Sequence, residues 1–110
     1  MQNLVVSNSR NFNQLVKGSS MSVAVSIPTI LRSYTGNARS VEASGESLKN
    51  LISDLDSKFP GLGDRLLENG QLRRFVNIYI NDEDVRFMGS LDAKLTDGDS
   101  VTILPAVAGG

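Results

Sequence analysis

The stretch SGESLKNLISDLDSKFPG (44–61) constrains the fold more than any other part of the chain. Its apolar residues recur every three or four positions, which places them along one side of an α-helix: Leu48, Leu51, Ile52, Leu55 and Phe59. Ser44 is the expected N-cap, Glu46 lies where the helix dipole favours a negative charge, and Pro60-Gly61 ends the helix. Because such a helix has to bury its apolar side against another layer, a sheet is expected from the flanking segments.

A period of two before the helix predicts the first strands of that sheet. In SVAVSI (22–27) every second residue is a valine or an isoleucine, and Pro28, which has no N–H to donate, ends the strand. A Thr-Gly-Asn turn signal at 35–37 leads to a second strand at 39–43. The two strands are expected to form a β-hairpin.

The region after the helix predicts a second, shorter helical piece and three more strands. The helical piece is expected at 63–68 and ends at Asn69-Gly70. RFVNIYI (74–80) alternates again, and a polar turn at 81–84 leads to a short return strand at 85–87. Asp97-Gly98 makes a tight turn before the last strand, whose inward residues are Val101 and Ile103.

The resulting order is strand, strand, long helix, strand, short strand, strand. One main helix packed across a mixed sheet of four to five strands accounts for it. The sequence therefore predicts an α+β chain with a β-grasp, ubiquitin-like fold in residues 21–110. Residues 1–20 are rich in Asn and Ser and are expected to be a flexible leader or a remnant of expression.

Composition excludes several classes of function. The 110 residues contain no Cys, which excludes disulfides and thiolate chemistry. They also contain no His, the side chain most used for acid–base catalysis near neutral pH. No catalytic or metal-binding residue is therefore expected. The net charge of −1 gives no general attraction to nucleic acid or to an anionic membrane. No apolar run reaches the roughly 18 residues of a membrane span, so we expect a cytoplasmic protein that is not an enzyme.

The final stretch, PAVAGG, is the strongest functional signal. Glycines are poor residues with which to end a fold, since they have no side chain to bury and lose much backbone entropy. Gly109 and Gly110 can instead pass through a narrow slot in a partner enzyme, and the small apolar residues Ala106, Val107 and Ala108 can line a channel behind them. The carboxylate of Gly110 would be the reacting group.

The chain from 21 to 110 resembles the ubiquitin-like sulfur carriers of the MoaD and ThiS superfamily, and within it the CysO-type carriers. The resemblance lies in VSIPTILR, RFVNIYINDEDVRF and DGDSVTILPAVAGG. It implies that an E1-like adenylyltransferase and sulfurtransferase uses ATP and Mg²⁺ to adenylate Gly110, which a sulfur donor converts to a thiocarboxylate.

The resemblance also implies a place in cysteine biosynthesis. A PLP-dependent cysteine synthase would make an aminoacrylate from O-phosphoserine, the thiocarboxylate would attack it, and a JAMM-type zinc metalloprotease would release the product. ATP, Mg²⁺, PLP and zinc belong to these partners, so no cofactor is expected on the carrier.

The Asp97-Gly98-Asp99 motif and a group of exposed apolar residues are two further candidate sites. Asp97-Gly98-Asp99 could suggest a cation site, but two carboxylates without further ligands favour a tight turn. Exposed apolar residues on the sheet face away from the helix predict a partner-docking face, made of Phe75, Tyr79, Phe87 and Leu104.

Three alternatives remain open from the sequence. The small, MoaD-type subunit of molybdopterin synthase also donates sulfur from a terminal Gly-Gly. A protein modifier would instead join Gly110 to lysines through isopeptide bonds. A plain binding module would keep its binding after loss of Gly109 and Gly110.

Overall fold

The computed structural model describes residues 22–105, which form two packed layers. The strands are β1 (Val23–Ser26), β2 (Ser40–Ala43), β3 (Leu67–Glu68), β4 (Gln71–Leu72), β5 (Val76–Ile80), β6 (Glu83–Asp84) and β7 (Ser100–Pro105). The α-helices are α1 (Leu48–Lys58) and α2 (Leu62–Leu66), and short 3₁₀ turns are η1 (Thr29–Thr35), η2 (Val85–Phe87) and η3 (Ser90–Asp92). Within this range no helix is both long and apolar enough to cross a membrane.

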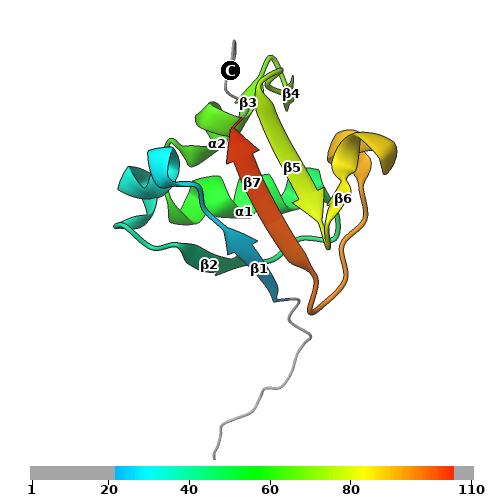
Figure 1. Cartoon of the computed structure of the whole chain (residues 1–110), viewed down its shortest axis with the longest axis horizontal. Coiled ribbons are helices and arrows are strands. Elements are labelled where there is room, and N and C mark those ends of the chain that lie inside the picture. Colours follow the sequence, from blue (N-terminus) through cyan, green and yellow to red (C-terminus); the bar gives the residue numbers. More distant parts are fainter. Residues whose placement is uncertain (1–21, 106–110) are drawn as a thin grey trace, which may run out of the picture.

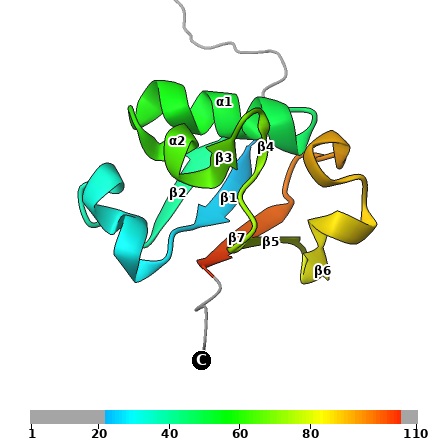
Figure 2. The same cartoon turned by 90° about the horizontal axis from the view of Figure 1, so that it is seen from above.

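Five strands form one mixed sheet in the order β2-β1-β7-β5-β6 (Figure 1). β1 pairs antiparallel with β2 and parallel with β7, and β7 pairs antiparallel with β5. The first and last strands are therefore neighbours in the middle of the sheet, while α1 and α2 cover one face of it (Figure 2). This is the predicted β-grasp arrangement.

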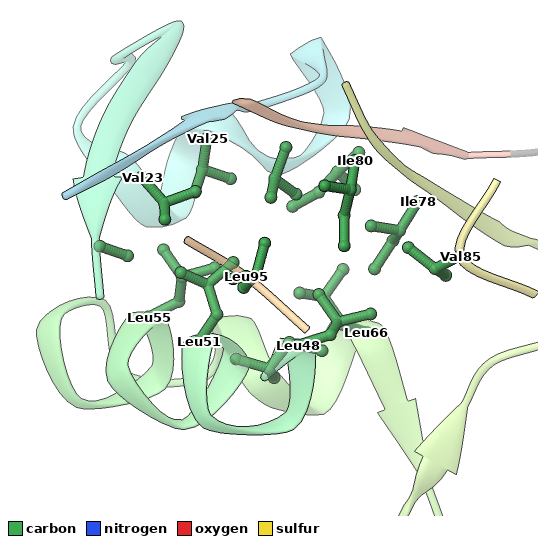
Figure 3. Close-up of a cluster of buried hydrophobic side chains, with 14 of the residues drawn as sticks. Val23, Val25, Leu48, Leu51, Leu55, Leu66, Ile78, Ile80, Val85 and Leu95 are labelled. Atoms are coloured by element: carbon green, nitrogen blue, oxygen red, sulfur yellow. The ribbon is translucent and has the colours of Figure 1, made fainter. Parts of the chain in front are cut away.

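The core lies between α1 and the sheet (Figure 3). From the helix it receives Leu48, Leu51, Ile52 and Leu55, all buried, which confirms the predicted stripe. From the sheet it receives alternate residues of the three long strands: Val23, Val25, Val76, Ile78, Ile80, Val101 and Ile103. The period of two in these strands was therefore interpreted correctly, and Phe59 packs only partly against the core.

The prediction that Ser44 caps the main helix is wrong by three residues. The N-cap is Ser47, whose Oγ accepts a hydrogen bond from Asn50 N at 3.3 Å. Ser47 is held extended in a bridge to Lys94, because Leu48 N donates to Ala93 O and Leu95 N donates to Glu46 O. The helix can begin only after this bridge, so Glu46 lies outside the first turn.

Two other predicted elements differ in kind. The helical piece expected at 63–68 is the helix α2 followed by a small hairpin, in which β3 pairs with β4 across Asn69-Gly70. Both turn residues have positive φ (55° and 77°), which suits a two-residue hairpin turn. The return strand is β6, not 85–87, because the Asp84 side chain accepts from Arg86 N and starts the 3₁₀ turn η2 there.

The outer edge of β2 is partly closed by α1. Lys58 Nζ donates to Glu42 O at 3.1 Å and forms an ion pair with Asp54 at 3.2 Å, while Asp54 accepts from Ser44 N at 2.9 Å. Desolvation raises the pKa of Asp54, but the Ser44 hydrogen bond and the Lys58 ammonium outweigh it and leave this pKa below its usual value. Side chains of the helix thus occupy backbone groups that an added strand would need.

Replacing Leu51 with Ala is expected to lower the free energy of unfolding by about 2–5 kcal/mol, because Leu51 is fully buried under the sheet. Urea denaturation followed by circular dichroism measures the change. The control is Ser57→Ala on the exposed side of the same helix, which should alter stability by no more than about 0.5 kcal/mol. Equal stability of Leu51→Ala and wild type would contradict the packing described here.

Candidate functional site

The strand β7 determines where the last residues of the chain leave the domain. Its first half, residues 100–102, pairs with β1 through Ala24, Val25 and Ser26, and residues 101–105 pair with β5 up to Val76 opposite Pro105. The two-sided pairing fixes the register of the strand. Pro105, the last described residue, is placed at the end of the sheet by its pairing with Val76, and we call it the tail root.

The predicted tail residues Ala106, Val107, Ala108, Gly109 and Gly110 lie outside the described residues. So do residues 1–21, which include the predicted leader. The roles of these segments and the boundary at residue 20 remain predictions.

The four residues of the predicted docking face lie in three places. Tyr79 and Leu104 point away from α1 on neighbouring strands and, with Asp82 and Thr102, line a shallow hollow of about 230 Å³. Leu104 is 47% exposed there. Phe75 instead lines a larger groove beside the tail root, and Phe87 stands on η2 with 84% of its surface exposed.

The motif Asp97-Gly98-Asp99 forms a turn held by hydrogen bonds. Asp99 Oδ2 accepts from Thr96 N at 2.9 Å and from its hydroxyl at 3.2 Å, and Asp99 Oδ1 accepts from Asn81 Nδ2 at 2.9 Å. Asn81 Oδ1 in turn accepts from Ser100 N at 3.0 Å. The carboxylates are thus used to fasten the turn, and residues 22–105 contain no cluster of acidic side chains suited to a metal ion.

These hydrogen bonds also shift the acidity of Asp99. The Thr96 N–H, and after it the Asn81 amide, stabilise the charged carboxylate and hold the pKa of Asp99 below its ordinary value of 3.8, against an opposing effect of desolvation. The network ties the start of β7 to the end of β5, so it helps to fix the strand that leads to the tail root.

Sequence reasoning missed the groove beside the tail root. Its wall combines residues far apart in the chain, among them Ile30 from η1, Arg65 from α2 and Pro105 from β7. The run Arg73-Arg74-Phe75 just before a central strand was the available signal, but only the fold brings Ile30 and Arg65 next to it.

With this geometry in view, comparison with known proteins defines the class. The model of the ThiS family matches residues 25–110, so the chain belongs to the ThiS family of ubiquitin-like proteins. The predicted membership of the MoaD and ThiS superfamily and the predicted fold are both confirmed.

Among individual proteins, the chain is highly similar to a sulfur carrier in both sequence and structure. The sulfur carrier protein CysO of Mycobacterium tuberculosis is 60% identical over 93 residues, which cover 82% of this chain and 100% of that protein. The crystal structure of Mycobacterium tuberculosis CysO matches with a TM-score of 0.75 at 59% identity, covering 77% of this chain and 99% of that one.

Two other solved structures are similar. A chain in the Amycolatopsis orientalis BexX/CysO complex matches with a TM-score of 0.77 and 56% identity, over 80% of this chain and 99% of that one. The small archaeal modifier protein 1 of Methanosarcina acetivorans matches with a TM-score of 0.72 and 31% identity, over 84% of this chain and 100% of that one.

The Asp99 network predicts a specific dependence of stability on pH. Because the folded-state pKa of Asp99 is lowered, its contribution is complete above the ordinary value of 3.8 and is lost as the pH falls through that value toward the folded pKa. Asp99→Asn should therefore be less stable than wild type at neutral pH, with a difference that shrinks in acid. Thermal melts of both proteins across this range measure it.

The matched control is Asp92→Asn, an exposed aspartate on η3 outside this network. Its stability should follow that of the wild type at every pH. A gap between Asp99→Asn and wild type that stays constant down to strongly acidic pH would show that the charge of Asp99 is not the stabilising feature.

Proposed function

We propose that this chain is a sulfur carrier protein whose Gly110 carboxylate is adenylated and then converted to a thiocarboxylate. The observation that carries the proposal is the 60% identity to the sulfur carrier CysO over the whole length of that protein. The family match that continues to residue 110, and a central strand that ends at the tail root, support the same role.

The chemistry requires an activating enzyme, because a carboxylate cannot expel oxide. ATP would convert the Gly110 carboxylate to an acyl-adenylate with release of pyrophosphate. A sulfur donor would then attack the carbonyl carbon, AMP would leave, and a C–S bond would replace the C–O bond to AMP. No side chain of the carrier is needed in either step, in keeping with a sequence that has no Cys and no His.

We further propose that the sulfur is used for cysteine biosynthesis from O-phosphoserine. The CysO relatives support this assignment. An E1-like adenylyltransferase and sulfurtransferase, a PLP-dependent cysteine synthase and a JAMM-type metalloprotease would act in turn on the tail. ATP with Mg²⁺, PLP and zinc would be bound by these enzymes and not by the carrier.

A second function is favoured by one specific likeness. The 31% identity to a small archaeal modifier protein keeps open that Gly110 is joined to lysines of other proteins. Both functions begin with the same acyl-adenylate and differ in the nucleophile, which is sulfur for a carrier and an amine for a modifier. High-mass conjugates in cell extracts would support the modifier.

Deleting Gly110, or adding one residue after it, is expected to abolish sulfur loading and leave the fold unchanged. The chemistry needs a free carboxylate at the position of Gly110. Deletion shortens the tail by one residue and an added residue moves the carboxylate beyond that position, whereas the described fold ends at Pro105. The measurement is the intact mass after incubation with ATP, Mg²⁺, sulfide and an E1-like activating enzyme. Wild type should gain the mass difference between sulfur and oxygen.

A chain that lacks residues 1–20 is the control, and it should load like wild type. Full loading of the extended chain, with no protease present to trim it, would overturn the assignment of Gly110. Adding O-phosphoserine and the synthase to the loaded protein then tests for a cysteine adduct, which the molybdopterin-related function does not predict.

The face of the sheet opposite α1 offers a surface on which the activating enzyme could dock. We propose that Tyr79 and Leu104, on the face of the sheet opposite α1, contact the activating enzyme, and that Tyr79→Ala/Leu104→Ala raises the Kd for it by about tenfold or more. Titration of the enzyme measures the Kd. Phe87→Ala removes a more exposed aromatic ring outside this hollow and should change the Kd little; an equal loss in both variants would contradict the proposed location.

A further inference from the structure

A groove of about 350 Å³ lies beside the tail root. Its floor is apolar and is made by Leu31, Val76 and Ile103, which all belong to the buried core. Pro105 forms part of the wall, so the groove adjoins the point where the chain passes into residues 106–110. In Figure 1 this end of β7 lies by α2 and the β3–β4 hairpin. An enzyme that takes up residues 106–110 therefore comes close to this groove.

The rim of the groove carries a local excess of positive charge. Three arginines line it, Arg65, Arg73 and Arg74, together with a single acidic residue, Glu68. Arg73 is already engaged: it lies 3.6 Å from Glu68 and donates two hydrogen bonds to the carbonyl of Asp64. Within residues 22–105, Arg65 and Arg74 form no ion pair, although the whole chain has a net charge of −1.

The same rim exposes large apolar side chains. Ile30 is 66% exposed and Phe75 is 52% exposed, and the Arg74 guanidinium lies over the Phe75 ring at 5.5 Å from its centre. Exposed apolar surface next to unpaired arginines is typical of protein interfaces, where aromatic residues and Arg are enriched. A partner that fits this groove therefore offers carboxylates for the rim and an apolar side chain for the floor.

We propose that this groove binds an acidic segment, with one apolar side chain, on the activating enzyme that takes up residues 106–110; this rests on the sulfur-carrier function proposed above. The segment places its carboxylates against Arg65 and Arg74 and its apolar side chain between Ile30 and Phe75. Contact at the root aligns the tail with the slot of the enzyme before the terminal glycines arrive. Binding at the groove and insertion of the tail strengthen each other, because the tail inserts within a complex that the groove contact has already formed.

The test is a charge reversal at the rim, Arg65→Glu/Arg74→Glu. Both side chains are exposed, so the fold should survive, and thermal melts followed by circular dichroism check this. The Kd of the carrier for the activating enzyme and the KM of ATP-dependent loading should both rise, by about tenfold at low salt and less at high salt. The kcat at saturating carrier should change little, since no reacting atom is touched.

The control is Lys49→Glu/Lys94→Glu, which makes the same change of net charge at two exposed residues outside the groove. The neutral variant Arg65→Gln/Arg74→Gln should show an intermediate loss. An unchanged Kd in the charge-reversed variant, or an equal loss in the lysine control, would overturn the proposal. Tighter binding or faster loading would also overturn it, because the partner would then not offer carboxylates to Arg65 and Arg74.

Sulfur loading of the wild type and the Kd values together distinguish failure of the carrier function from failure of the groove proposal. If wild type binds the activating enzyme but gains no sulfur, the carrier function fails while the Kd values still decide whether the groove is the contact. If wild type loads normally and the charge-reversed variant loads with an unchanged KM, only the groove proposal fails.

Discussion

The pairing of the first strand with the last, in the middle of the sheet, is the constraint on which the rest of the structure depends. β1 and β7 run parallel, so the chain between them has to cross the sheet, and α1 makes that crossing. The buried side of α1 then supplies the core that holds all five strands together. Parallel neighbours cannot be joined by a short turn, which is why the crossover is needed. β7 has β1 on one side and β5 on the other, so it is not an edge strand.

This placement separates the fold from its reactive end. Stability comes from residues between Val23 and Ile103, whereas the proposed chemistry belongs to residues after Pro105. Hydrogen bonds around Asp99 and the pairing of Val76 with Pro105 fix both ends of β7, so the described part of the chain ends at a defined point of the sheet. In the proposed role the chain would need no catalytic side chain, only an end that partner enzymes can receive.

The sequence predicted the features that depend on local periodicity. The stripe of α1 and the alternation in β1, β5 and β7 each report one buried face, which a single segment can reveal. One error occurred where distant contacts decided the outcome. The N-cap is Ser47 and not Ser44, because hydrogen bonds to residues 93–95 hold Ser47 extended. In addition, Gly45 lies so close to α1 that a Cβ would clash with the backbone of Leu51. The Asn69-Gly70 turn signal was noticed, but it was assigned to a helix end instead of a hairpin.

The tail was evident from the sequence because it is one continuous stretch. The groove beside it was not, since η1, α2, β3, β5, β7 and the segment between β4 and β5 all contribute to it. The groove offers an explanation of how a tail with only small side chains could be selective for its partner enzymes. Two glycines and three small apolar residues offer an enzyme few distinguishing contacts, and small-residue ends of this kind can fit many slots. Discrimination among partners therefore has to come from the folded surface next to the tail. Arg65, Arg74, Ile30 and Phe75 line the groove beside the tail root, and they are the residues to which we assign this role there.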